Sequence, residues 1–149
     1  MTPGLRETLA RVADAAAGAV EPWWIIGSAA VALHGRAVDV REDVDVLTSP
    51  TGALRLLQRF GGEAAPGEAS ALFRSEVFGR WNGAPLVVEV MGGLHLRTAG
   101  GWQPVRIETR QAVNVEGRTV FVPTAEELVR LLGAFGRPKD MERARRLLG

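Results

Sequence analysis

The chain has 149 residues, of which 46% are hydrophobic and 23% are charged, and its 18 Lys and Arg side chains nearly balance its 17 Asp and Glu side chains. A net charge of +1 excludes an acidic disordered chain and a uniformly basic nucleic-acid coat, and the absence of cysteine excludes a disulfide scaffold, a thiolate metal site and a cysteine nucleophile. The length suits one compact domain with a sizeable core. No window of about 18 residues is apolar enough to span a membrane, and the N-terminus has no signal-peptide pattern, so we expect a soluble, cytoplasmic protein.

The N-terminal part of the sequence predicts a helix, a strand and a second, short helix. Thr2 can cap a first helix whose apolar stripe runs to Gly18. The short apolar run at 22–26 then predicts a strand that is buried on both faces at the centre of a sheet. A Gly-Ser turn at Gly27 and Ser28 leads from this strand into the short helix.

An acidic strand and another helix follow. The segment 43–47 alternates with period two, so its valines face one way and its two aspartates the other. Ser49 supplies a cap, and the proline after it suits the first turn of a helix that runs through Phe60. The segment 61–70, rich in Gly, Ala, Pro and Glu, is the best candidate for a mobile loop.

The middle of the chain predicts paired strands. An Asn-Gly pair joins the strand-like runs 72–81 and 85–91, which is a strong signal for a hairpin, and a Gly-Gly pair is expected to end the second strand. In that second strand Glu89 faces away from the valines on either side of it. Shorter strands are expected at 105–107 and around 113–122.

The C-terminal part predicts two helices. A capping-box match at 124–127 opens the first, the Gly-Arg-Pro triplet at 136–138 ends it, and a last helix follows. We therefore predict an α/β (α+β) protein with a mixed, largely antiparallel sheet and helices packed on it. It should form a single domain, with a core at about 19–122 and a C-terminal helical segment at 123–149.

The acidic residues within strands are the candidates for chemistry. Asp43 and Asp45 are two residues apart, so their carboxylates project from one face of the strand, and such like charges repel unless a positive charge lies between them. Mg²⁺ prefers oxygen ligands and can fill that place, with Glu89 as a third ligand from a neighbouring strand. Three carboxylates can hold two metal ions about 4 Å apart. The competing interpretation is that all three side chains are solvated on an exposed face.

The Gly-Ser turn is a candidate phosphate site. Gly27 lets the backbone turn sharply and lets a phosphate approach the amides at the start of the next helix, and the Ser28 hydroxyl can donate to a phosphate oxygen. The competing interpretation is that Ser28 is an ordinary helix N-cap.

The combination of these motifs resembles the DNA polymerase beta-like nucleotidyltransferase superfamily. The family motif is an apolar strand, Gly-Gly or Gly-Ser, a spacer, and then Asp-h-(Asp/Glu)-h, where h is hydrophobic; here the spacer is 29–42. The segments 25–35 and 41–47 look like the small bacterial members, and 122–140 is similar to the C-terminal segment of members related to toxin–antitoxin and abortive-infection systems. The resemblance covers about Trp23 to Leu148 and implies the nucleotidyltransferase fold.

The resemblance also implies roles for the acidic residues. Asp43 and Asp45 would bind two Mg²⁺ ions, and Glu89 would be the third carboxylate, on the acceptor side, where it could help to deprotonate the attacking hydroxyl. The substrate would be a nucleoside triphosphate, with ATP as the first choice.

The triphosphate would lie on Gly27 and Ser28, and Arg41 could neutralise phosphate charge, although an arginine at that position is equally well a surface group. The chain departs from the family pattern in three ways. Its third carboxylate is Glu rather than the more usual Asp, its spacer is slightly longer, and Leu132 stands where related small proteins often carry a lysine.

The sequence thus predicts a metal-dependent enzyme that moves a nucleoside monophosphate from a nucleoside triphosphate to an acceptor. The alternative is a catalytically degenerate module that binds a nucleotide or acts as one partner of a toxin–antitoxin or defence pair. The acceptor is open between a small molecule, a protein side chain and a transfer-RNA end, and a homodimer or a partner protein could supply surface that binds it. The last 14 residues carry five Lys and Arg against two Asp and Glu. They form either a basic edge facing a nucleotide or RNA end, or a solvated helix face.

Overall fold

The computed structural model describes residues 1–40, 43–62, 64 and 70–149. The helices are α1 (Pro3–Ala16), α2 (Gly27–Leu33), α3 (Pro50–Phe60), α4 (Ala125–Phe135) and α5 (Pro138–Leu148). The strands are β1 (Trp23–Ile26), β2 (Asp43–Thr48), β3 (Phe73–Trp81), β4 (Val87–Thr98), β5 (Gly101–Pro104), β6 (Gln111–Val115) and β7 (Arg118–Val122). No helix within these described ranges is long and apolar enough to cross a membrane.

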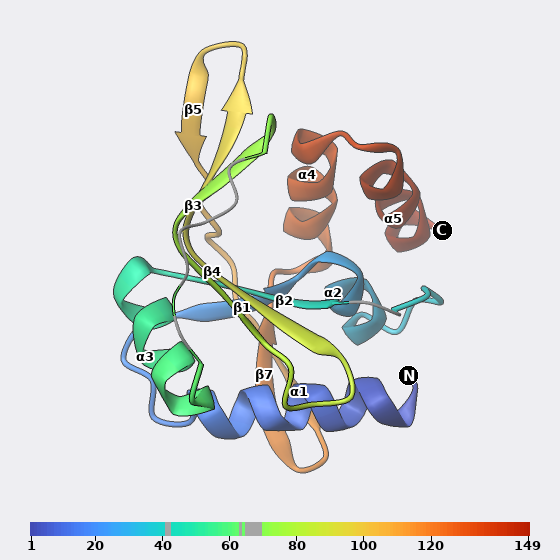
Figure 1. The fold of residues 1–149 in the computed structure, drawn as a ribbon. Helices are drawn as coiled ribbons and strands as arrows, with labels where there is room; N and C mark the ends of the chain where they lie inside the picture. The colour runs from blue at the N-terminus through green and yellow to red at the C-terminus, as the bar shows by residue number, and fades with distance from the viewer. Residues whose placement is uncertain (41–42, 63, 65–69) are drawn as a thin grey trace.

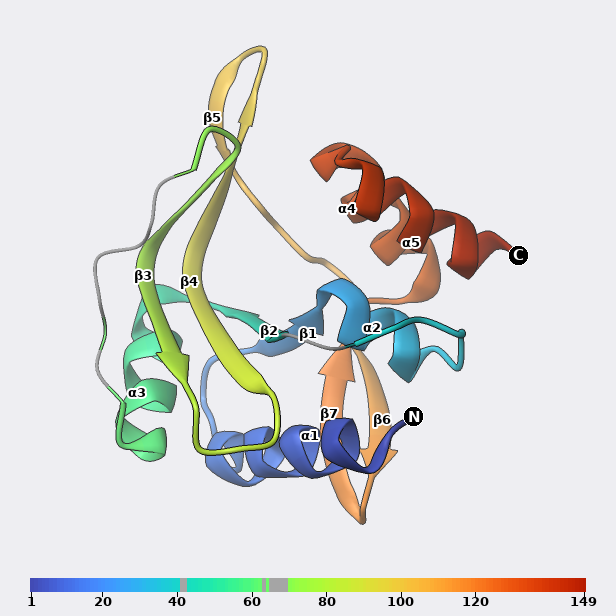
Figure 2. The same cartoon turned by 45° about the vertical axis from the view of Figure 1, so that its right-hand side comes forward.

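A five-stranded mixed sheet organises the fold. Its order is β1-β2-β4-β3, with β5 paired to the far part of β4, and β2–β4 is the parallel pair among otherwise antiparallel neighbours. A separate two-stranded sheet, β6–β7, lies beside α1 (Figure 2). Figure 1 shows α4 and α5 packed together on one side of the molecule, with α3 on the other side and α1 running beneath. The predicted mixed, largely antiparallel sheet with packed helices is confirmed.

The core explains why these segments fold together. Val44 and Val46 of β2 and the neighbouring valines of β4 are completely buried against apolar side chains of α1 and α3. The same buried cluster includes Leu128 of α4 and Leu147 of α5. Alternation along β2 and β4 therefore places the valines in the core and leaves the acidic residues on the opposite face.

The helix ends follow the predicted chemistry. Thr2 Oγ1 accepts from the Leu5 N–H at 3.2 Å, and Ser49 Oγ accepts from the Gly52 N–H at 3.0 Å. The capping box at the start of α4 is only half formed, because Thr124 accepts from the Glu127 N–H but the carboxylate of Glu127 turns elsewhere. That carboxylate accepts the N–H groups of Glu108 and Thr109, both at 2.8 Å, and so fixes the connection before β6 onto α4.

One predicted position in the sheet is wrong. β1 lies at the edge rather than the centre, since it pairs with β2 alone. It is nevertheless largely buried, because the second sheet covers it: the Trp23 ring meets Phe121 of β7 edge-to-face at 5.4 Å, and Trp24 Nε1 donates to the Thr109 carbonyl at 2.8 Å. The apolar run at 22–26 therefore correctly indicated a buried strand. Sequence periodicity cannot show whether such a strand is buried at the centre of its sheet or, as here, at the edge beneath a second sheet.

The middle strands also differ from expectation. The connection between β3 and β4 is a five-residue loop, 82–86, rather than a two-residue turn, and β4 continues through the Gly-Gly pair to Thr98. Gly93 has φ +67°, so the strand bends there without losing its pairing with β3. Residues 105–110 form an irregular connection instead of the strand expected at 105–107. Most of the loop expected to be mobile, namely 63 and 65–69, lies outside the described residues.

Candidate metal and nucleotide site

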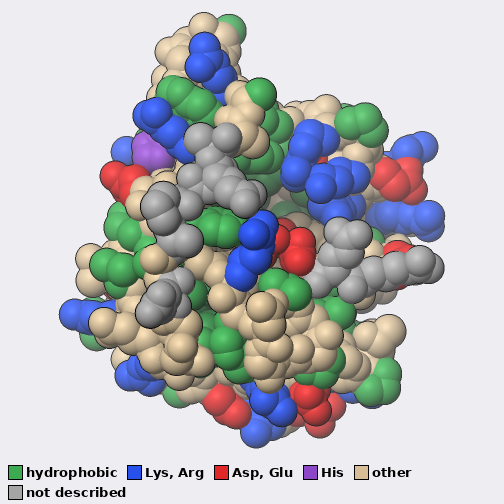
Figure 3. Space-filling view, viewed as in Figure 1, with side chains coloured by type: hydrophobic (Ala, Val, Ile, Leu, Met, Phe, Trp, Pro, Cys, Tyr) green, Lys and Arg blue, Asp and Glu red, His purple; other side chains and the backbone are tan. Residues whose placement is uncertain are grey.

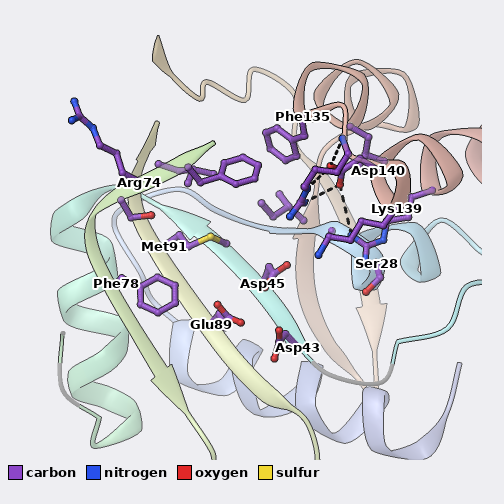
Figure 4. A pocket seen from close by; sticks show the side chains of 18 of the residues that line it. Ser28, Asp43, Asp45, Arg74, Phe78, Glu89, Met91, Phe135, Lys139 and Asp140 are labelled. Atoms are coloured by element: carbon purple, nitrogen blue, oxygen red, sulfur yellow. Dashed lines mark hydrogen bonds and ion pairs between the residues drawn. The ribbon is translucent and has the colours of Figure 1, made fainter. Parts of the chain in front are cut away.

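Three carboxylates from two neighbouring strands come together at one point on the sheet. Asp43 and Asp45 share a face of β2, and the parallel register with β4 sets Glu89 opposite Asp45. One oxygen of each carboxylate lies within 4.8 Å of the others. Figure 4 shows the three side chains directed into the same open space. The structure thus brings together the residues that the sequence selected, and their partial burial disagrees with the competing interpretation that all three are solvated on an exposed face.

This arrangement is electrostatically costly. Burial, together with the neighbouring Asp43, raises the pKa of Asp45 to about 6, although Arg143, Lys139 and Arg137 oppose the rise. Burial, a hydrogen bond with Asp43 and the charges of both aspartates raise the pKa of Glu89 to about 7. The nearby Lys and Arg side chains therefore do not cancel the effects of burial and of the neighbouring acids on these two carboxylates, and a divalent cation would relieve this imbalance.

Arg80 of β3 is the nearest partner of Glu89. Its Nε lies 3.8 Å from Glu89 Oε1, and the Arg80 side chain is 47% exposed while that of Glu89 is 16% exposed. At this distance the pair is loose, and Arg80 lowers the pKa of Glu89 without cancelling the effects that raise it. The guanidinium lies beside the acidic group rather than sealing it.

The turn between β1 and α2 lies against Asp45. Gly27 has φ +70°, and a Cβ at this position would lie 2.8 Å from Asp45 Oδ2. Any side chain here would therefore be strained and would press on the carboxylate. Ser28 is a residue inside α2, whose N-cap is Ile26, so the interpretation of Ser28 as an N-cap is wrong. Both Gly27 and Ser28 line the cleft that contains the acidic residues.

The cleft has a volume of about 490 Å³ and two chemically different walls. On one side α5 and its N-cap residue contribute the cations Arg137, Lys139 and Arg143, and Figure 4 shows Lys139 beside Ser28. On the other side β3 and β4 contribute Phe78 and Met91 together with Arg80. Figure 3 shows acidic side chains in the hollow of this face, with Lys and Arg side chains on both sides of them.

A buried aspartate fixes the basic wall. Asp140 is completely buried, and its carboxylate accepts from the Arg137 N–H at 3.2 Å, from its Nε at 2.6 Å and from its Nη2 at 2.9 Å. Arg143 Nη1 lies 3.8 Å from the same carboxylate, and the Arg137 guanidinium lies over the Phe73 ring at 4.9 Å. Arg137 is therefore held in one orientation at the cleft.

The remaining predicted and missed residues can now be placed. Arg41 lies outside the described residues. Leu132 is buried with the core and also lines the cleft, so the cations of this wall come from α5 instead of α4. Sequence reasoning missed Arg80 and Phe78. The observed register sets Arg80 opposite Glu89 and Phe78 opposite Met91, whereas the expected two-residue turn at 82–83 would have set Arg80 opposite Pro85, so the sequence carried no signal for these pairs.

Comparison with solved structures identifies the fold. The chain is similar to a Thermotoga maritima protein assigned provisionally as a nucleotidyltransferase (TM1012), with TM-score 0.75 and 24% identity over 95% of this chain and 90% of that one. It is also similar to ANT(2'')-Ia in complex with adenylyl-2''-tobramycin, with TM-score 0.59 and 16% identity over 95% and 88% of the two chains. A third similar structure is the lincosamide antibiotic adenylyltransferase LnuA bound to lincomycin, with TM-score 0.62 and 13% identity over 100% and 98%. The predicted nucleotidyltransferase fold is confirmed.

Comparison of the sequence itself gives no family: no protein-family model matches it, and no curated protein matches it.

Proposed function

We propose that this chain is a metal-dependent nucleotidyltransferase, which moves a nucleoside monophosphate from a nucleoside triphosphate to an acceptor hydroxyl. The observation that carries the proposal is the meeting of Asp43, Asp45 and Glu89 in a cleft whose facing wall is basic. The shared fold with ANT(2'')-Ia and LnuA supports it, because both are described with adenylylated or antibiotic ligands.

The donor set fits a hard divalent cation. Three carboxylates offer only oxygen ligands, and the raised pKa values of Asp45 and Glu89 indicate a cluster short of positive charge. Gly27 leaves the space next to Asp45 Oδ2 free of side-chain atoms. Asp43 and Asp45 would hold two Mg²⁺ ions, with Glu89 joining on the acceptor side, and bound ions would supply charge neutralisation at the α-phosphate and a lower pKa for the attacking hydroxyl.

The basic wall is suited to the triphosphate. The Lys139 ammonium and the Arg143 guanidinium come from the first turns of α5 and line the cleft together with Ser28. A triphosphate between them would meet charge-assisted donors from α5 and the Ser28 hydroxyl from α2. The proposed role of Arg41 in phosphate binding stays a prediction, since this residue lies outside the described part of the chain.

The acceptor then belongs on the side of Glu89 that faces β3. The oxygen of the acceptor hydroxyl forms a bond to the α-phosphorus. The bond from that phosphorus to the oxygen that bridges to the β-phosphate breaks, and pyrophosphate leaves with the electron pair. The Glu89 carboxylate takes the hydroxyl proton or passes it to water. The chain's part in this reaction is positioning and charge neutralisation, with no covalent protein intermediate.

Transfer of label tests this proposal. The protein is incubated with each α-labelled nucleoside triphosphate, Mg²⁺ and a set of acceptors that includes tobramycin, lincomycin and single-stranded oligonucleotides, and labelled product and pyrophosphate are measured. We expect Asp43→Asn and Asp45→Asn to lose at least about 100-fold in rate, since each removes a proposed ligand. Glu126→Gln, an exposed acid on α4, is the matched control and should keep the wild-type rate.

Titration with Mn²⁺ gives a readout that does not need an acceptor. Calorimetry should show binding to the wild-type protein and to Glu126→Gln, and none to Asp43→Asn. Equal binding by all three proteins would overturn the proposed site. Metal-dependent nucleotide binding without transfer to any acceptor or release of pyrophosphate would instead favour the degenerate binding module.

A further inference from the structure

The far part of β4 together with β5, residues 94–104, forms a projection that we call the arm. β4 and β5 pair from His95 with Pro104 to Thr98 with Gly101, and β3 covers the other edge of the arm as far as Leu96. Figure 1 shows the arm standing out beyond the sheet and the helices. Leu94 and Leu96 at the base of the arm are buried in a second, smaller apolar cluster with Phe135 of α4. Residues 97–104 belong to neither core cluster, so core packing does not explain the outer part of the arm.

An aromatic ring on the arm is flanked by two guanidinium groups. The Arg74 Cζ lies 4.7 Å from the centroid of the Trp102 ring, and the Arg97 Cζ lies 5.7 Å from it. Both arginines are exposed and Trp102 is half-buried. Arginines beside a partly exposed aromatic ring are groups that proteins use for single-stranded nucleic acids, in which bases stack on rings and phosphates bind guanidinium groups.

The charge of this region is mainly positive. Between Glu89 and Glu108 the sequence contains no Asp or Glu, but it contains Arg97 and Arg106. Glu76 of β3, two residues from Arg74, offsets one of the positive charges in the neighbourhood. A polyanion is therefore attracted to the arm, whereas a polycationic acceptor such as an aminoglycoside is repelled.

The arm is continuous with the acceptor side of the cleft. β3 runs from Arg74 at the arm to Arg80 beside Glu89, six residues or about 20 Å at the usual rise of a strand. Phe78, whose ring lies 5.2 Å from the Arg80 guanidinium, stands between them and lines the cleft. Figure 4 shows Phe78 close to Glu89 and Arg74 directed away from the acids, toward the arm.

We propose that the acceptor is the end of a single-stranded nucleic acid and that the arm binds the nucleotides preceding that end. The terminal hydroxyl would reach Glu89, the terminal base would lie on Phe78, and the preceding nucleotides would follow β3 to Trp102. This inference rests on the proposed transferase function for the chemistry of the hydroxyl. The binding surface itself needs neither a metal nor a nucleoside triphosphate.

Binding of a fluorescent ten-nucleotide oligomer, as RNA and as DNA of the same sequence, tests the inference by anisotropy in EDTA without nucleotide. For Arg74→Ala/Arg97→Ala we expect weaker binding and a slope of log K against log salt that is smaller by about 1.4, at about 0.7 for each lost phosphate contact. Trp102→Ala should weaken binding by about fivefold or more, and Trp102→Phe should restore most of it. Thermal denaturation of each variant checks that the arm change has not unfolded the protein.

The matched control removes two arginines at the other end of the molecule. Arg6 pairs with Glu116 at 3.2 Å and Arg118 pairs with Asp14 at 2.9 Å, both on exposed surface. Arg6→Ala/Arg118→Ala should bind either oligomer within about twofold of the wild type, because exposed pairs contribute little. Absence of binding to both oligomers, or equal losses in the two double variants, would overturn the inference.

The results can distinguish an error in the proposed nucleic-acid surface from an error in the proposed transferase function. Loss of label transfer to every acceptor, with oligomer binding that depends on Trp102, would remove the transferase and leave the nucleic-acid surface. Label transfer to a small molecule, with no binding of either oligomer, would keep the transferase function and overturn the nucleic-acid surface.

Discussion

The acidic cluster has a measurable cost for the folded protein in the absence of metal. Asp45 has its pKa raised from 3.8 to about 6, first by burial and then by the charge of Asp43. The folded state therefore binds this proton more tightly than the unfolded state does. Stability is unaffected by the group below about pH 3.8, falls as the pH rises through about 6, and stays lower above that value.

The substitution Asp45→Asn removes this cost and keeps the shape of the side chain. A shift of about two pKa units corresponds to about 3 kcal/mol at pH 8. For a chain of this length 1 kcal/mol moves Tm by about 2–4 °C, so the variant should melt roughly 6–12 °C above the wild-type protein at pH 8 in EDTA. The direction is unusual, since most substitutions of partly buried residues destabilise.

Differential scanning calorimetry at pH 4 and pH 8 measures the stability of both proteins below and above the pKa of Asp45 in the folded state. At pH 4 the two proteins should differ by less than about 1 kcal/mol, because Asp45 is then protonated in the folded state. Mg²⁺ at pH 8 should raise Tm of the wild-type protein and leave that of Asp45→Asn nearly unchanged. A variant that melts at or below the wild-type temperature at pH 8 in EDTA would refute the reasoning, and Glu126→Gln, an exposed acid, controls for loss of one negative charge.

Three further changes test other parts of the site and fold. Gly27→Ala should cost about 1–2 kcal/mol, because φ is +70° and the new Cβ would press on Asp45; a calorimetric Tm equal to the wild type would contradict this. Asp140→Asn leaves Arg137 without its buried counter-charge and should lower the free energy of unfolding, measured by urea denaturation, by about 2–4 kcal/mol. It should also raise KM for the triphosphate more than it lowers kcat. An unchanged KM would argue against a role for Arg137 in the cleft. Burial raises the pKa of Glu127, but hydrogen bonds from two backbone N–H groups and a hydroxyl outweigh burial and hold the pKa below the usual 4.5. The wild type should therefore lose stability as the pH falls below about 4.5, whereas Glu127→Gln should be less stable at pH 7 and should change less in stability as the pH falls. Urea denaturation of both proteins over this pH range measures the difference, and the same pH dependence in both would contradict the prediction.

The acidic residues were predictable because they break a local rule. Aspartates are rare in strands, and the two on β2 follow strict alternation, so their common face could be derived from spacing alone. Their meeting with Glu89 could not be derived in the same way, since it depends on the parallel pairing of β2 with β4 across about 40 intervening residues. The sequence selected Glu89 as an acid isolated among valines, and the family resemblance gave it the place of the third carboxylate; the parallel pairing itself is known from the structure alone.

Other features depended on contacts that a sequence pattern does not carry. The burial of β1 comes from Phe121 of a different sheet, and the incomplete capping box of α4 comes from backbone N–H groups of the preceding connection that compete for Glu127. A glycine pair normally ends a strand, and Gly93 instead bends β4 while β3 holds it in register. These are cases in which tertiary packing outweighs a local signal.

The two walls of the cleft show how the fold separates charges that would otherwise cancel. Asp140 is completely buried and accepts two hydrogen bonds from the Arg137 guanidinium, which holds this cation at the basic wall. On the other wall, Arg80 Nε lies 3.8 Å from Glu89 Oε1 and lowers the pKa of Glu89 only in part. The pKa values of Asp45 and Glu89 therefore stay raised. The cost of burying Asp45 and Glu89 close together is offset by the fully buried valines on the opposite face of β2 and β4. The stable core on one face of these strands thus supports an unfavourable cluster of charges on the other.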